Sequence, residues 1–158
     1  MDIGMVAAAW LHVLGMIVVL GYYGTLGRVA LPGLRRTLDG ETLVRTVAAI
    51  ERRALPIVIL GIVLFMVTGV VLLVNDDRYG GLGNLFANTW STLLAVKHGV
   101  VILMFALGVA IDRLIAGLPE LASDDARQRG VGTLELAADG MTGMGALVLL
   151  LTVIAQAS

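Results

Sequence analysis

The stretch from Trp90 to Ile111, WSTLLAVKHGVVILMFALGVAI, decides the fold, because it is long and apolar enough to cross a membrane as one helix. Two ionisable residues, Lys97 and His98, stand side by side within it. Ionisable groups inside a membrane are costly and usually face a partner, a cavity or a cofactor. The stretch therefore predicts a membrane span that also carries a functional site.

The rest of the chain shares this apolar character. Of its 158 residues, 58% are hydrophobic, against about 45–50% in an average soluble domain. The apolar residues gather in four runs, and we expect transmembrane helices at about residues 3–31, 55–74, 91–115 and 134–155. The short connections leave no room for a soluble domain. We therefore predict one all-α domain over residues 1–158, an integral membrane bundle of four transmembrane helices in a lipid bilayer.

The connection over residues 32–54 is polar and basic. Leu43, Val47 and Ile50 recur in it at helical spacing, which indicates an amphipathic surface helix or an extension of the second span. Pro56 is then expected in the first turn of the second transmembrane helix, where proline is tolerated.

Arginine placement predicts the orientation in the membrane. The first and third connections with their flanks hold nine arginines: Arg28, Arg35, Arg36, Arg45, Arg52, Arg53, Arg113, Arg127 and Arg129. The second connection holds Arg78 alone, and the N-terminus has no basic residue. Because cytoplasmic loops are enriched in Lys and Arg, we expect both termini to lie outside.

Composition also excludes several classes of function. The chain has no cysteine, which rules out disulfides, thiolate metal sites and covalently attached c-type haem. The net charge is −1, and no basic stripe with interleaved aromatic residues is present, so we expect no nucleic-acid partner.

The two histidines, His12 and His98, are predicted at the same depth in the membrane. His12 follows Asp2 by ten residues, about 15 Å along the first helix at ~1.5 Å per residue. His98 follows Trp90 by eight residues, about 12 Å along the third helix. Both helices start on the same side of the membrane, so the two imidazoles should lie at nearly equal depth.

Two imidazoles at equal depth on two helices of a small bundle are typical of a haem b site. We expect His12 and His98 to be the two axial iron ligands, with Lys97 beside the macrocycle or a propionate. The outer residues Arg78 and Trp90 would hold the propionates, and Gly15 would give the flat ring room. Six-coordinate haem suits one-electron transfer, with a redox protein or a quinone as partner.

Copper is an alternative occupant of the same region. Met5, His12 and Met16 share one face of the first helix, and Met104 lies about a turn and a half beyond His98. Thioether and imidazole ligands suit Cu(I). Structural histidines are a further alternative.

A separate ion pair is expected at the cytoplasmic end of the bundle. Arg28 follows His12 by sixteen residues, about 24 Å along the helix. Asp139 and Asp112 should lie at a similar level, so we expect Arg28 to pair with one of them.

Several short motifs resemble a known group of small four-helix membrane proteins. The motifs are Leu11-His12 followed by Arg28, Ile50-Glu51-Arg52-Arg53 before the second span, and Ala95-Val96-Lys97 in the third. They resemble the copper-resistance CopD domain and the HemJ-type protoporphyrinogen oxidases over roughly residues 8–113.

The resemblance implies haem b binding and oxidase activity through His12 and Lys97, or copper movement across a bacterial plasma (inner) membrane. Val19 stands where a HemJ-type tryptophan is expected, and His98 is additional. The alternatives are therefore a CopD-like copper-handling protein, a HemJ-like oxidase, or a structural subunit of a larger membrane complex. The small size favours an oligomer or a subunit.

Overall fold

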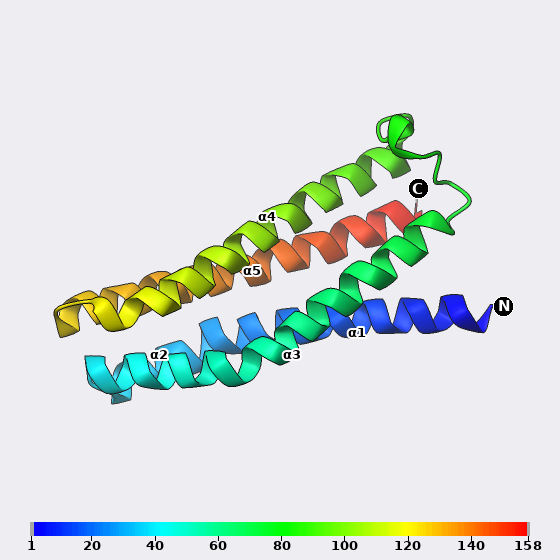
Figure 1. The fold of residues 1–158 in the computed structure, drawn as a ribbon. Helices are drawn as coiled ribbons and strands as arrows, with labels where there is room; N and C mark the ends of the chain where they lie inside the picture. The colour runs from blue at the N-terminus through cyan, green and yellow to red at the C-terminus, as the bar shows by residue number, and fades with distance from the viewer. Residues whose placement is uncertain (1, 158) are drawn as a thin grey trace.

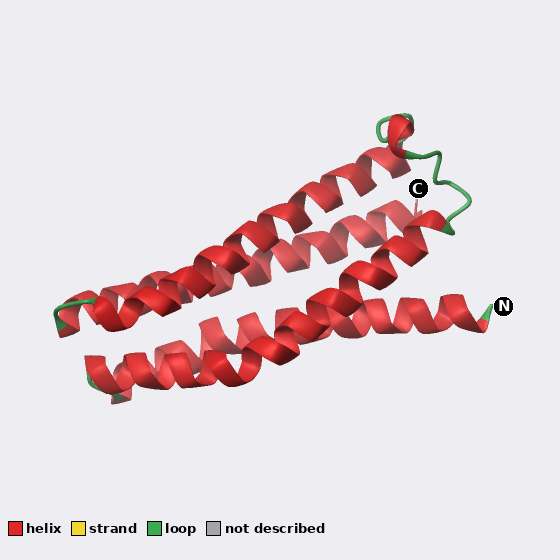
Figure 2. Ribbon diagram, viewed as in Figure 1, coloured by secondary structure: helices red, strands yellow, loops and turns green. Residues whose placement is uncertain are grey.

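The computed structural model describes residues 2–157 as long helices joined by short turns (Figures 1 and 2). The elements in chain order are α1 (Ile3–Thr25), the π-helix η1 (Leu26–Ala30), α2 (Leu31–Thr37), α3 (Gly40–Val74), the 3₁₀ turn η2 (Leu82–Asn84), α4 (Thr89–Gly117), the 3₁₀ turn η3 (Leu118–Glu120) and α5 (Asp124–Ala157). Four helical segments are long and apolar enough to cross a membrane, namely Ile3–Thr37, Gly40–Val74, Thr89–Glu120 and Asp124–Ala157. The prediction of an all-α bundle with four such helices is confirmed.

The helices are longer than the apolar runs predicted. The second run was expected to begin at residue 55, but α3 begins at Gly40, so Pro56 lies inside the helix rather than in its first turn. The reason lies at the true start, where the Asp39 carboxylate accepts a hydrogen bond from the Thr42 backbone N–H at 3.0 Å and caps the helix. The segment 40–54 is thus an extension of the second helix, one of the two predicted alternatives.

A π-helical turn separates α1 from α2. The Leu31 backbone N–H donates to the Leu26 carbonyl five residues earlier, which is the bond of the wider π turn. Pro32 follows in the first turn of α2. Proline has no N–H, and its ring crowds the carbonyl four residues earlier. A widened turn just before it lets the helix continue with little change of direction.

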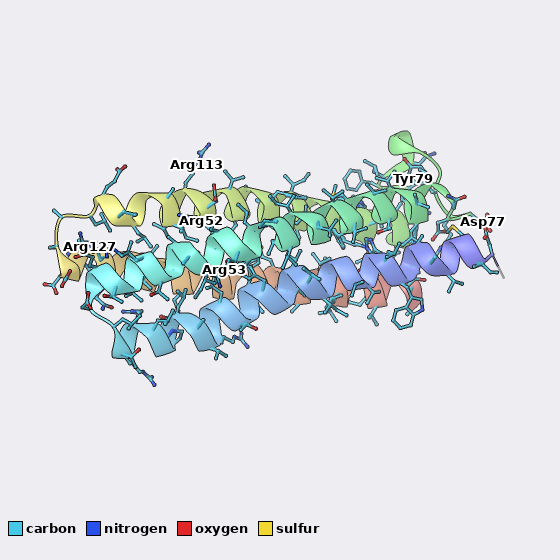
Figure 3. All side chains as sticks on the ribbon, turned by 60° about the horizontal axis from the view of Figure 1, so that its bottom comes forward. Arg52, Arg53, Asp77, Tyr79, Arg113 and Arg127 are labelled. Carbon is cyan, nitrogen blue, oxygen red and sulfur yellow. The ribbon has the colours of Figure 1, made fainter. Side chains whose placement is uncertain are left out.

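The two ends of the bundle differ in arginine content. The N-terminus, the C-terminus and the loop 75–88 lie together at one end, which we call the loop end, and the two short turns lie at the other (Figure 1). In Figure 3, Arg52, Arg53, Arg113 and Arg127 lie toward the end with the short turns, whereas Asp77 and Tyr79 lie at the loop end. We call the end with the short turns the arginine end.

The four helices associate as two pairs. α1 packs mainly on α3 and α4 mainly on α5, with a further contact between α1 and α5, whereas α3 and α4 scarcely touch. The α1–α3 crossing is very close, because a Cβ on Gly15 would lie 2.6 Å from the Gly61 carbonyl oxygen. Small residues permit this approach of two backbones. The weak α3–α4 contact leaves space inside the bundle.

Candidate functional site

A cavity near the loop end brings three of the predicted site residues together. His12 from α1 and Lys97 and His98 from α4 line this space of about 250 Å³, which we call the loop-end cavity. α3 and α5 supply much of the remaining wall, including Phe65, Gly69, Leu73, Val148 and Thr152. α1 and α4 do not pack closely on each other, so the two histidines approach the cavity from different walls.

The His12 ring is held by α3. Its Nδ1 lies 2.9 Å from the Phe65 carbonyl oxygen and 3.2 Å from Thr68 Oγ1, and the ring stacks on the Phe65 ring at 4.3 Å between centroids. A Cβ on Gly69 would lie 2.9 Å from the imidazole Cε1, so the glycine makes room for the ring. Because a carbonyl only accepts, Nδ1 carries the proton and Nε2 keeps its lone pair.

His98 shows the same arrangement on α4. Its Nδ1 lies 2.7 Å from the Leu94 carbonyl oxygen, one helical turn earlier. Nδ1 is therefore the donor here too, and Nε2 again keeps a lone pair. Among residues 2–157 neither Nε2 makes a hydrogen bond. Histidines that bind metals usually donate their second ring nitrogen to a carbonyl or carboxylate in this way.

Lys97 adds positive charge to the cavity. The side chain is half-buried and forms no ion pair within the described part of the chain. Lys97 lines the same cavity as His12 and His98. An ammonium group in such a setting attracts an anion.

Arg78 and Trp90 close the loop end of the cavity in a different way from that predicted. The Trp90 side chain is 7% exposed and lines the cavity. Arg78 lies outside the lining, with its guanidinium carbon 4.9 Å from the centre of the Trp90 ring. It donates to both Asp76 carboxylate oxygens, at 3.0 and 3.1 Å, and this pairing lowers the pKa of the Asp76 carboxyl. Arg78 therefore holds the loop over Trp90 and is not poised to bind a propionate.

The remaining predicted residues are dispersed. Gly15 faces the backbone of α3 and does not line the cavity, so it allows helix packing rather than the approach of a macrocycle. Met16 lines the loop-end cavity together with His12, but Met104 lines the neighbouring cavity and Met5 lines neither. The structure does not gather the predicted copper ligands around one point.

The predicted ion pair at the arginine end is present. Arg28 Nε lies 3.2 Å from Asp139 Oδ1. A pair that the sequence analysis missed lies nearby, where the Tyr22 hydroxyl donates to the buried Glu51 carboxylate. The α3 partners of His12 were missed as well, and the only sequence signal for them is a Thr-Gly step at residues 68–69 in an otherwise aliphatic run.

Comparison of the chain with protein-family models, with curated proteins and with solved structures found no match.

Proposed function

We propose that this chain is a membrane haem b protein of the bacterial plasma membrane, with both termini outside, that takes part in one-electron transfer. In this proposal His12 and His98 bind the haem iron in the loop-end cavity. The observation that carries the proposal is that both imidazoles line one cavity, each with Nδ1 bonded to a carbonyl and Nε2 unused.

The number of donors favours haem over a bare ion. No group of three or more His, Asp, Glu or Cys side chains that could hold a metal occurs among residues 2–157. Haem needs only two protein ligands, because the porphyrin supplies four nitrogens itself. The cavity of about 250 Å³ lies just below the ~300–1,000 Å³ typical of ligand pockets, so the helices around it would have to separate to admit a porphyrin.

The chain's own residues would bind and shield such a group. Lys97 would neutralise a propionate where the local dielectric is low. Trp90, held under Arg78, would cover the loop end of the group. Haem iron with imidazole at both axial positions supplies one-electron redox chemistry rather than oxygen binding. A redox protein or a quinone would then exchange the electron.

The rival functions have less support from the geometry. A copper-handling role would use Met5, Met16 and Met104, and of these only Met16 shares the cavity with His12, although Met66 of α3 lines it as well. A HemJ-like oxidase would use the same cavity through His12 and Lys97, so only an activity assay separates it from the electron-transfer proposal. A structural subunit without a cofactor would leave the two Nε2 lone pairs without a role.

The direct test is a reduced-minus-oxidised spectrum of the full chain purified in mild detergent. We expect haem b bands in the wild type, their loss in His12→Ala and in His98→Ala, and their retention in Met16→Leu. Met16→Leu is the matched control, because it alters the same cavity and removes a predicted copper ligand only. Size-exclusion profiles identify variants that fail to fold. In a folded His98→Gly protein, added imidazole should take the place of the missing ring and restore the haem b bands.

Three outcomes would overturn the assignment. The first is a wild-type spectrum without haem b bands from cells supplied with haem precursor. The second is a His12→Ala protein that keeps its spectrum, and the third is copper bound in place of haem and lost with Met16→Leu.

The orientation has its own test, because the chain contains no cysteine. A single cysteine at Asn84, in the loop 75–88, should react with a membrane-impermeant maleimide in intact cells. A cysteine at Ser123, in the α4–α5 turn, should react only after lysis. The opposite pattern would reverse the proposed orientation.

A further inference from the structure

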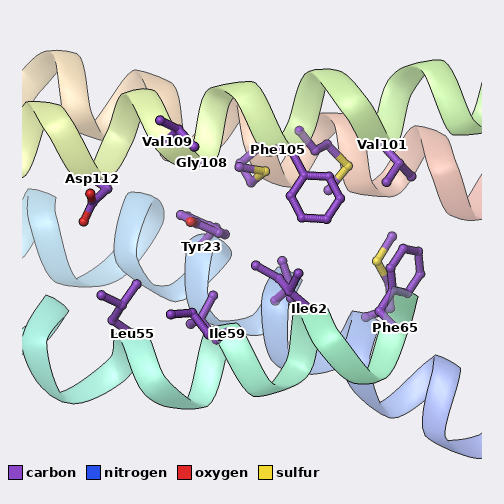
Figure 4. A pocket seen from close by; sticks show the side chains of 15 residues that line it. Tyr23, Leu55, Ile59, Ile62, Phe65, Val101, Phe105, Gly108, Val109 and Asp112 are labelled. Carbon is purple, nitrogen blue, oxygen red and sulfur yellow. The ribbon is translucent and has the colours of Figure 1, made fainter. Parts of the chain in front are cut away.

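A second cavity lies beside the loop-end cavity, further toward the arginine end. This central cavity has a volume of about 300 Å³ and shares Met16, Phe65 and Val101 with the loop-end cavity. Its wall is almost wholly aliphatic and aromatic and comes from α1, α3, α4 and α5. Figure 4 shows Asp112 at one end of it and Phe65 at the other.

The central cavity opens sideways, toward the lipid. Its lining includes Ile59 of α3 and Phe105 and Val109 of α4, whose exposed fractions are 50%, 37% and 52%. These residues flank the line along which α3 and α4 scarcely touch. A molecule dissolved in the membrane can therefore reach the cavity without crossing the water phase.

Tyr23 presents a polar group to the central cavity. Tyr23 is only 6% exposed, and its hydroxyl makes no hydrogen bond with any described residue. The hydroxyl points toward α4, where a Cβ on Gly108 would lie 3.7 Å from it. The adjacent Tyr22, by contrast, donates to Glu51. The hydroxyl oxygen is not among the fully buried side-chain atoms that lack a partner, so it reaches accessible space at the cavity and is free to donate to a ligand atom held there.

Asp112 supplies an acceptor at the same end of the cavity. Its side chain lines the cavity (Figure 4) and forms no ion pair or hydrogen bond within residues 2–157. The polar end thus offers one donor, from Tyr23, and one anionic acceptor. The Asp112 carboxylate would repel a phosphate or carboxylate head group, and no Lys or Arg lines the cavity to offset this repulsion.

We propose that the central cavity binds the head of a quinone or quinol. The ring would lie among the aliphatic side chains, a ring oxygen would accept from Tyr23, and a quinol hydroxyl would donate to Asp112. The apolar tail would leave between α3 and α4 into the membrane. A cavity of about 300 Å³ suits one substituted ring rather than a macrocycle. Binding at this place does not depend on haem.

The test is photolabelling of the full chain in lipid nanodiscs with an azidoquinone carrying a ten-carbon tail. We expect labelling of residues 55–62 or 101–112 and its suppression by decylubiquinone. The matched competitors are decanol and decanoic acid, which share the tail and lack the quinone head. Equal suppression by these competitors would show that the cavity holds an acyl chain only, and would overturn the proposal.

Variants locate the site. Tyr23→Phe keeps the ring but removes the donor, and should weaken decylubiquinone competition roughly three- to tenfold, as loss of one hydrogen bond does. Gly108→Leu should abolish labelling by filling the cavity. Its control is Gly99→Leu on the same helix, where an added Cβ would meet nothing within 4 Å. Tyr79→Phe, in the loop, is the control for loss of a hydroxyl.

The outcomes separate the two proposals. Wild-type labelling in both Tyr23→Phe and Gly108→Leu would refute the central cavity as the site. If Gly108→Leu does not fold, Gly108→Ala replaces it, since its Cβ would make only ordinary contacts at 3.6 and 3.7 Å. The labelling is repeated in His12→Ala protein, where it should persist without haem bands, so either proposal can fail alone.

Discussion

The crossing of α1 and α3 at Gly15 allows a sharp test of the packing. A Cβ at this position would lie 2.6 Å from the Gly61 carbonyl oxygen and 2.9 Å from the Phe65 nitrogen. Both neighbours are backbone atoms, so no side chain can move aside, and the two helices must separate by several tenths of an ångström. Gly15→Ala therefore strains the largest interface between helices in the molecule.

The size of the effect follows from two opposing contributions. Overpacking of a close interface costs about 1–3 kcal/mol, whereas Gly→Ala inside a helix gains up to about 1 kcal/mol. Gly21→Ala, on the same helix, isolates the second contribution, because its Cβ would meet nothing within 4 Å. We therefore expect Gly15→Ala to be less stable than Gly21→Ala by about 1–3 kcal/mol, or about 2–12 °C in melting temperature at this size.

The assay is thermal unfolding in one detergent at fixed protein concentration, followed by circular dichroism. A second readout comes from His12, one turn away, whose Nδ1 contact with the Phe65 carbonyl should lengthen as the helices separate. Equal melting temperatures for Gly15→Ala and Gly21→Ala would refute the α1–α3 crossing described above.

Three further predictions concern charged and polar groups. Tyr22→Phe leaves the buried Glu51 carboxylate without its hydrogen-bond donor and should lower the free energy of unfolding by about 1–3 kcal/mol. The double variant Tyr22→Phe with Glu51→Leu should recover most of this loss in the same melting assay. Arg78 lowers the pKa of the Asp76 carboxyl. The Arg78–Asp76 pair therefore stabilises the folded state fully above the ordinary carboxyl pKa of about 3.9, and this stabilisation is lost as the pH falls through the lowered pKa. The melting-temperature difference between wild type and Asp76→Asn should thus persist from pH 7 to about 4 and vanish on further acidification; a difference that grows in acid would contradict the pairing. Under the haem proposal, Lys97→Gln should keep the haem but lower its midpoint potential, because loss of a nearby cation favours the ferric state, and redox titration would show this.

The sequence predicts the helices well because membrane spans are long and uniform. It does not predict where they end, because hydropathy marks only the hydrocarbon-crossing part. In α3 the charged segment that begins at Gly40 continues the same helix, since Arg and Glu are good helix formers. Boundaries there depend on a cap such as Asp39, which is a single residue.

For the candidate site, too, the sequence predicts some features and not others. Depth along a helix is simple arithmetic, and it predicts His12 and His98 at nearly equal depth; both side chains line one cavity. The direction in which a side chain points depends on how helices cross. Gly15 faces α3, and Arg78 is paired with Asp76. The depth of a residue along its helix predicts neither of these contacts. The central cavity has no sequence signature, because it arises where α3 and α4 fail to pack.

The length of α3 bears on which half of a bilayer communicates with the central cavity. At ~1.5 Å per residue, its 35 residues extend about 52 Å, well beyond a hydrocarbon layer of about 30 Å. The excess lies at the arginine end, where drawing a guanidinium into hydrocarbon costs about 2.5–3.5 kcal/mol and so resists vertical displacement of the whole bundle. Under the proposed membrane orientation, the α3–α4 opening would face the acyl chains of the leaflet next to the arginine end. Molecules in that leaflet would enter directly, whereas molecules in the opposite leaflet would first have to flip across.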